Sequence, residues 1–369
     1  PNYVHSWCLS HFFDGLGKKL VCGLLKTFLK LWTKVFSKSP SAREIFFSVT
    51  KETWIRKHRI RWGSAHYQVM QLQRIWNQLS RVLEGLKSAK VSEEGTKKLA
   101  AFMENQKTMY CGLALELSMF ADVVGRFREA NLLLQGDGFL SPFVNHTVGK
   151  VLEMFHGMTD QRWAQTLPNV AACISTAPEH VLRGALWSNV KQMIQPAYEN
   201  FKAFFLDCVA DGEAKVSFVK LRVLFRFAQL FHPHCTIKWM NRQGNQVLAI
   251  GDQLKAPEVC ALLESEQLIA ELGQEWPALV KEYSSVLNQS DGTATPFLDP
   301  SELTLFWKAR RTVFPAWFEA ARRFALICPS SAAAERGFSA WRTLIGDQQT
   351  TTLEDRQKLV LQYRFSTKI

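Results

Sequence analysis

The sequence lacks the short motifs that identify the commonest enzyme families. It contains no glycine-rich phosphate-binding loop, no G-x-S-x-G nucleophile elbow and no metalloprotease helix with paired histidines. Its eight cysteines are scattered and form no C-x-x-C pair. Scattered cysteines are typical of a reduced intracellular protein and do not predict a disulfide framework. The familiar local signals of nucleotide, ester and zinc-dependent peptide hydrolysis are therefore missing.

Long apolar runs and internal repeats are also absent from the sequence. No stretch of about 18 apolar residues runs uninterrupted, so we expect no membrane-spanning helix and no membrane partner. No pattern recurs with a period of about 20–50 residues, which excludes a solenoid. Hydrophobic residues nevertheless make up 47% of the chain, with 26 phenylalanines and 12 tryptophans. Such a chain can bury a sizeable core.

Acidic residues are scarce in the first 62 residues. This segment holds twelve lysines and arginines but only three acidic residues, and the whole chain carries a formal net charge of +12. Positive charge so concentrated favours the binding of a polyanion, and nucleic acid is the first candidate. We therefore predict DNA as a partner. The alternative is an ordinary solvated basic face.

The lysines of this segment follow the pattern of one amphipathic helix over residues 12–38. Apolar residues at helical spacing define one side of it. Lys26, Lys30 and Lys34 repeat every four residues along another side. We predict that these three lysines, together with Arg61, bind nucleic acid.

Helical periodicity dominates the remainder of the chain, so a mainly α fold is expected. One short strand is expected at residues 4–8. Cys8 at its end and His11 after it would supply only half of the ligands of a zinc site. They are therefore either zinc ligands or buried structural side chains. His232, His234 and Cys235 lie close together in the sequence, and they too are either metal ligands or structural side chains.

A proline–serine turn followed by an alanine-rich helix lies near the C-terminal end of the sequence. Ser331 is a suitable N-cap for this helix. A capping box would place its glutamate three residues after the cap, whereas Glu335 lies four residues after it. Glu335 is therefore either a solvated acid near a positive helix end or a functional carboxylate.

This block resembles the C-terminal region of hAT-superfamily DNA transposases. The residues that carry the resemblance are Pro329, Ser330, Ser331, Glu335, Arg336, Phe338 and Ser339. Gly337 departs from the family, which often has a bulky apolar residue there. The resemblance implies that Glu335 is the third acid of an Asp-Asp-Glu catalytic set and a metal ligand. The implied cofactor of a complete catalytic core is Mg²⁺, which suits sites built from oxygen ligands.

Two segments near the start of the chain also resemble the family, in the family's order. Cys8 and His11 match a strand that ends in Cys-x-x-His and is followed by a helix. Arg61, Trp62 and Ser64 match a Thr-Arg-Trp step that is followed shortly by Ser at the end of the first core segment, although Ile60 replaces the usual threonine. If the family resemblance is set aside, Trp62 is interpreted as an aromatic residue that anchors the packing of two helices.

The resemblance implies an RNase-H-like α/β core that is interrupted by a large helical insertion. We therefore expect a basic partial core segment at 1–64, an all-helical insertion domain at 65–300 and C-terminal core helices at 301–369. The family's two aspartates would precede Pro1. We thus expect the C-terminal part of a longer nuclear protein, which by itself binds no cofactor and cuts no DNA.

The last expected helix, at residues 353–365, carries an apolar stripe. Its members are Leu353, Leu359, Val360 and Tyr363. The matching family region is linked to dimerisation, so we expect a homodimer or higher homo-oligomer through this stripe; the alternative is docking on the chain's own core.

Two rivals to a transposase-like enzyme remain: a non-catalytic, transposase-derived module that dimerises and binds DNA, and an unrelated helical scaffold.

Overall fold

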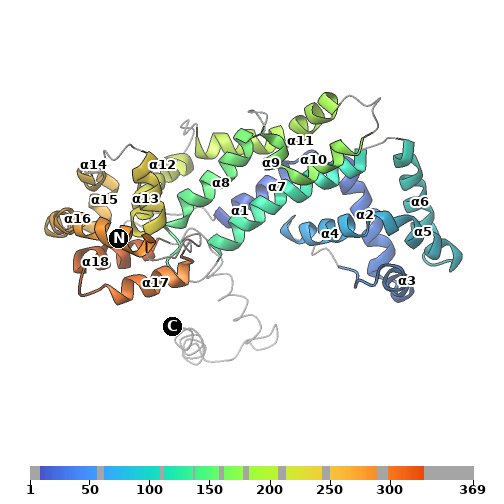
Figure 1. Ribbon diagram of the computed structural model, residues 1–369. Helices are drawn as coiled ribbons and strands as arrows, with labels where there is room; N and C mark the ends of the chain where they lie inside the picture. The colour runs from blue at the N-terminus through green and yellow to red at the C-terminus, as the bar shows by residue number, and fades with distance from the viewer. Residues whose placement is uncertain are drawn as a thin grey trace. The chain divides into compact units, whose positions relative to one another are not determined.

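The computed structural model consists of helices in the part of the chain that it describes (Figure 1). The described residues run from 9 to 327, except for 56–61, 109–111, 136–137, 158–161, 178–182, 207–212, 243–249 and 289–297. The mainly α fold expected from the sequence is confirmed for these residues, which include no strand. The strand predicted at 4–8 lies outside them.

The described residues divide into two compact units. The N-terminal unit comprises residues 11–131 and 147–216, and the C-terminal unit comprises 132–146 and 217–327 together with Leu9 and Ser10. The three domains expected from the sequence, with boundaries after residues 64 and 300, stay a prediction. Among the described helices, none is both long enough and apolar enough to cross a lipid bilayer.

The helices of the N-terminal unit are mostly short, and α1, α7 and α8 each include residues of the C-terminal unit. They are α1 (Leu9–Lys19), α2 (Gly23–Ser37), α3 (Pro40–Thr50), α4 (Trp62–Arg74), η1 (Trp76–Gln78), α5 (Leu79–Ser88), α6 (Glu93–Thr108), α7 (Gly112–Leu134), α8 (Phe143–Gly157), α9 (Trp163–Thr166), α10 (Pro168–Ser175) and α11 (Arg183–Phe205).

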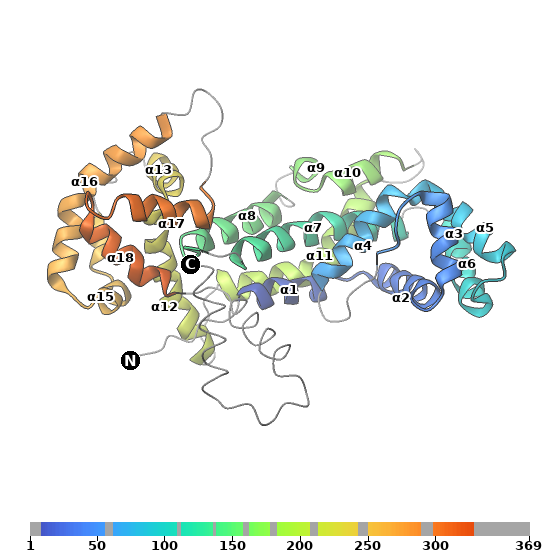
Figure 2. The same cartoon turned by 90° about the horizontal axis from the view of Figure 1, so that it is seen from below.

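An aromatic cluster joins α2 to α3, and α5 and α6 pack against these two helices; the four helices lie side by side in both views (Figures 1 and 2). Trp32 is 1% exposed, and its ring centroid lies 4.4 Å from that of Phe36 and 6.0 Å from that of Phe46. Trp54 stacks on Phe36 at 6.0 Å. Each fully buried aromatic side chain stabilises the fold by roughly 2 kcal/mol, so this cluster fixes the position of α2.

The single helix expected over residues 12–38 is two helices, which corrects the prediction. α1 ends at Lys19 and α2 begins at Gly23. Between them, Val21 N donates a hydrogen bond to Met193 O of α11 at 3.0 Å. The apolar periodicity continues through this break, and the bond that directs the chain comes from a residue far along the sequence. Periodicity alone therefore did not predict the break.

Two buried acids of α7 cap the starts of other helices. Glu116 is 7% exposed, and its Oε2 accepts a hydrogen bond from Leu25 N in the first turn of α2 at 2.7 Å. Asp122 accepts one from Val170 N in the first turn of α10 at 3.0 Å. The residues at the N-cap positions of α2 and α10 make no side-chain cap bond. Carboxylates from α7 thus satisfy N–H groups that a local cap usually satisfies.

The C-terminal unit packs its helices around a second aromatic core. Trp307 Nε1 donates to Phe231 O at 3.0 Å, and Trp317 Nε1 donates to Leu272 O at 3.1 Å. The helices are α12 (Glu213–Ala228), η2 (Gln229–Phe231), α13 (Pro233–Arg242), α14 (Ile250–Leu254), α15 (Pro257–Leu263), α16 (Glu266–Asn288), α17 (Pro300–Ala309) and α18 (Pro315–Ala325). α12 begins in the N-terminal unit.

The loop before α8 passes very close to the start of α17. Gly138 has a φ of 105°, and a Cβ atom at this position would lie 2.5 Å from Pro300 O. Phe139 N donates to the same carbonyl oxygen at 3.1 Å and to Thr304 Oγ1 at 3.1 Å. Both the positive φ and the close approach require glycine here.

Candidate nucleic-acid interface

The three lysines predicted to bind nucleic acid lie on the exposed side of α2, and we call them the lysine row. Lys26, Lys30 and Lys34 are exposed, whereas six apolar residues on the other side of the helix, among them Phe28 and Trp32, are buried. A step of four residues advances about 6 Å along a helix axis, so the row spans about 12 Å. One nucleic-acid strand presents a phosphate about every 3.4 Å of axis. The lysine row can therefore face several phosphates at once.

Two acids lie within electrostatic reach of the lysine row: Glu116 acts on Lys26, and Glu94 acts on Lys34. Lys26 Nζ donates a hydrogen bond to Leu20 O at 3.1 Å. Glu94 of α6 lies within electrostatic reach but already pairs with Lys98 Nζ at 2.5 Å. The hydrogen bond and charge of Lys98, followed by the charge of Lys34, lower the pKa of Glu94. Because Lys98 neutralises this acid, Glu94 takes little positive potential away from the row.

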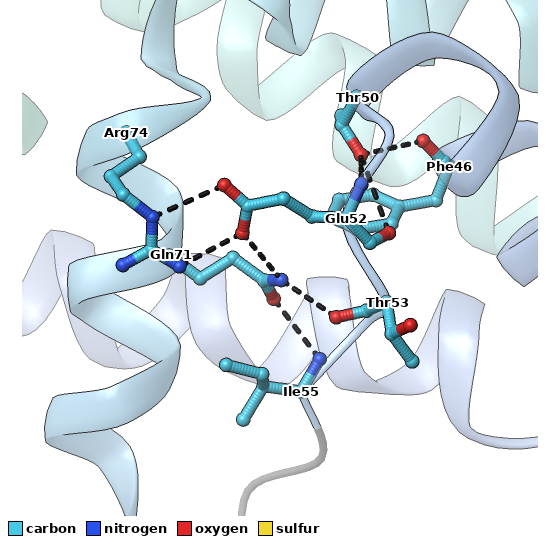
Figure 3. A network of polar contacts seen from close by, with 7 residues as sticks. All are labelled: Phe46, Thr50, Glu52, Thr53, Ile55, Gln71 and Arg74. Carbon is cyan, nitrogen blue, oxygen red and sulfur yellow. Dashed lines mark hydrogen bonds and ion pairs between the residues drawn. The ribbon is translucent and has the colours of Figure 1, made fainter.

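Gln71 of α4 holds the extended segment that leads toward Arg61 (Figure 3). Its side chain is buried, and its Nε2 donates to Thr53 O at 2.8 Å and to Glu52 Oε2 at 3.1 Å. Its Oε1 accepts from Ile55 N at 3.0 Å. One amide therefore satisfies three groups of a segment that has no regular hydrogen-bonding partner of its own.

A bidentate ion pair between Arg74 and Glu52 lies next to Gln71. Arg74 Nε donates to Glu52 Oε1 at 3.1 Å, and an Arg74 terminal nitrogen donates to Glu52 Oε2 at 2.8 Å (Figure 3). The hydrogen bond from Arg74 lowers the pKa of Glu52. Both side chains are partly exposed, so the pair contributes no more than about 1 kcal/mol to stability. Its role is to orient the carboxylate that Gln71 contacts.

The other residues that carry the family resemblance near the start of the chain are only partly described. His11 is exposed on α1. Trp62 is the first residue of α4, but its side chain, like Cys8 and Arg61, lies outside the description. The structure therefore brings together the lysine row and leaves the roles of Cys8, Arg61 and Trp62 as predictions.

The predicted catalytic and dimerisation residues lie outside the described part of the chain. They are Glu335, Arg336, Phe338 and Ser339, and Leu353, Leu359, Val360 and Tyr363. Within the described part, no three His, Cys, Asp or Glu side chains come together as a possible metal site. Glu335 as a catalytic acid and metal ligand, and Mg²⁺ as its cofactor, remain predictions.

His232 acts as a helix cap. Its Nδ1 accepts a hydrogen bond from Cys235 N in the first turn of α13 at 3.4 Å, and its Nε2 lies 3.1 Å from Leu298 O. The ring is fully buried and packs edge-on against Phe143 at 5.2 Å. Burial lowers the pKa of His232 to about 4, although the bond to Leu298 opposes the shift. These contacts use both ring nitrogens and favour the structural alternative over a metal site.

Sequence reasoning missed the polar residues that fix these elements. Glu116 and Asp122 interrupt an apolar stretch in α7, and that interruption is the one signal that could have drawn attention to them. Gln71 gave no comparable signal, because glutamine is common on exposed helix faces. Its importance depends on burial, which the sequence does not show directly.

No family model matches the chain, and no curated protein sequence matches it. The resemblance to hAT transposases thus rests on the motifs quoted above.

Proposed function

We propose that this chain binds DNA through the lysine row of α2 as part of a hAT-type, transposase-like protein. The observation that carries the DNA-binding part is the exposure of Lys26, Lys30 and Lys34 in one line on a helix whose opposite side is buried. A helix fixed in this way presents its ammonium groups without having to order itself on binding. Contacts of this kind position a protein on the phosphate backbone and carry no sequence information.

The catalytic part of the proposal rests on Glu335 and its sequence block. In a complete core, Glu335 would supply one carboxylate to a metal site, and Mg²⁺ would activate the attacking oxygen and stabilise the leaving oxygen. One carboxylate does not hold two metal ions, so further acids are needed. An RNase-H-like core would likewise have its strands outside the described residues, because the described residues include none.

The alternative function is a non-catalytic, transposase-derived protein that dimerises and binds DNA. It rests on the same lysine row and on the same C-terminal stripe. In both functions the C-terminal stripe mediates self-association and the protein is nuclear. The two differ only in whether Glu335 takes part in a reaction.

A triple substitution tests the DNA-binding proposal. Lys26→Gln, Lys30→Gln and Lys34→Gln together remove the row, and we expect duplex affinity to fall by at least tenfold at about 50 mM salt, since non-specific binding is dominated by phosphate contacts. The matched control changes Lys87, Lys90 and Lys150 to Gln, which removes the same charge from exposed positions outside α2. Equal losses in both variants would show that net charge, and not the row, attracts DNA.

A further inference from the structure

Two tryptophans of the N-terminal unit stack on each other while both stay partly exposed. Trp163 is the first residue of α9 and Trp187 lies near the start of α11. Their ring centroids are 4.6 Å apart, and their planes meet at 26°. Lys191, one turn after Trp187, places its Nζ 5.9 Å from the centre of the Trp187 ring. The pair is thus an ordered aromatic surface with a cation over the Trp187 ring.

This pair differs from the tryptophans that build the cores. Trp32 and Trp317 are at most 1% exposed, whereas Trp163 and Trp187 keep part of their surface in solvent. An indole ring has few rotatable bonds, and stacking restricts them further, so little conformational entropy is lost when a third flat group joins the stack. The arrangement therefore suits recognition of a planar ligand.

The charge around the pair favours an anionic ligand. Residues 162–205 contain four lysines and arginines and two acidic residues. Arg162 precedes Trp163 directly, and Arg183 begins α11; both are exposed. The same unit carries the lysine row. A flat ligand attached to a negatively charged backbone is a nucleotide within a strand, and every base offers a face for stacking.

We propose that Trp163 and Trp187 form a stacking platform for an unpaired nucleobase of single-stranded nucleic acid, with Lys191 beside the adjoining phosphate. This inference rests on the proposed nucleic-acid binding and adds a preference to it. A base inside a duplex is already stacked on its neighbours and cannot reach the platform. The platform therefore strengthens binding of single strands, while the lysine row binds the backbone of either form.

The test compares the affinities of a thymidine oligonucleotide and of a duplex of equal length for the same variants. Base–aromatic stacking is lost in Trp163→Ala, so single-strand affinity falls about tenfold, while duplex affinity stays at the wild-type value. Trp163→Phe keeps an aromatic face and retains most of the affinity. The matched control is Trp76→Ala, which removes a partly exposed tryptophan of the same unit and leaves both affinities unchanged.

Lys191→Gln tests the same site and leaves both tryptophan rings in place. It lowers the salt slope of single-strand binding by about 0.7, the value of one phosphate contact. If circular dichroism shows that Trp163→Ala is unfolded, Lys191→Gln is the deciding variant. An unchanged salt slope of single-strand binding in Lys191→Gln then overturns the platform. In a folded Trp163→Ala, wild-type single-strand affinity, or an equal loss for strand and duplex, overturns it too. A wild-type chain that binds neither ligand instead overturns the proposed function itself.

Discussion

His232 shows how one buried side chain makes the fold sensitive to pH. Its neutral ring accepts from Cys235 N and packs against Phe143, and burial lowers its pKa from 6.5 to about 4. Protonation in the unfolded chain begins near pH 6.5, whereas the folded chain resists it until about pH 4. Stability contributed by the neutral ring is therefore complete above pH 6.5 and is lost as the pH falls toward 4.

His232→Asn should remove much of this acid sensitivity. The shift corresponds to on the order of 3 kcal/mol between pH 6.5 and 4, and asparagine can cap the helix without titrating. Urea unfolding at several pH values gives the free energy of unfolding for both proteins. We expect a flatter pH dependence in the variant than in wild type. His156→Asn, at an exposed position of α8, is the control, and an equal flattening there would contradict the role of His232.

Single residues differ in how well the sequence predicted them. The exposure of Lys26, Lys30 and Lys34 was predicted because lysine and apolar positions alternate at helical spacing. Gln71 could not be predicted, because its partners lie 16 to 19 residues earlier in the chain and meet it only after folding. The positions of exposed residues could be predicted from the local sequence pattern, whereas the contacts of a buried polar residue could not.

At the scale of the helices, several helix starts are capped by acidic side chains of other helices. α2, α10 and α18 begin without a side-chain cap of their own. Glu116, Asp122 and Glu275 take that place from other helices; Glu275 accepts from Ala316 N at 3.2 Å. Pro315, at the first helical position, predicted the start of α18. The distant acids were not predicted, because Glu116 lies 91 residues from the N–H group that it accepts.

Glu116→Gln should change how the stability of the N-terminal unit depends on pH. Burial raises the pKa of Glu116, and the bonds from α2 only partly offset this effect. The protonated acid is thus favoured in the folded chain, and stability is lost as the pH rises from the ordinary value through the raised pKa. Glutamine does not titrate, so the variant should gain stability relative to wild type over that rise.

The measurement for Glu116 is the difference in unfolding free energy between variant and wild type from pH 4 to 8. We expect this difference to move in favour of the variant as the pH rises. Glu84→Gln removes one charge from an exposed position of the same unit and controls for net charge. A difference for Glu116→Gln that stays constant with pH would show that the buried acid does not resist ionisation.

At the scale of the whole molecule, the helical class was predictable and the grouping of helices was not. Periodic apolar residues predicted helices through most of the chain, and the described residues bear this out. The N-terminal unit, however, joins residues 11–131 to 147–216, and the C-terminal unit joins 132–146 to 217–327. Such grouping depends on contacts between distant residues, which a local pattern does not contain.

Self-association is a prediction for the whole chain. The stripe of Leu359, Val360 and their neighbours must bury its apolar face, and we expect that a second copy covers it. Leu359→Asp with Val360→Asp should convert the assembly to a monomer in sedimentation, because buried unpaired charges cost several kcal/mol. Lys358→Asp changes the charge on the opposite side of the predicted helix and should leave the assembly intact. A monomeric wild type at tens of micromolar, or a double variant that unfolds, would contradict this account.

The salt dependence of duplex binding tests the central claim, that the lysine row binds the phosphate backbone. Each phosphate contact contributes about 0.9 to the slope of log affinity against log salt concentration. Measured between about 50 and 200 mM salt, the wild-type slope should therefore exceed that of the Lys26, Lys30 and Lys34 triple variant by two to three. The Lys87, Lys90 and Lys150 variant should keep the wild-type slope. Equal slopes for wild type and the lysine-row variant would show that the row does not touch DNA.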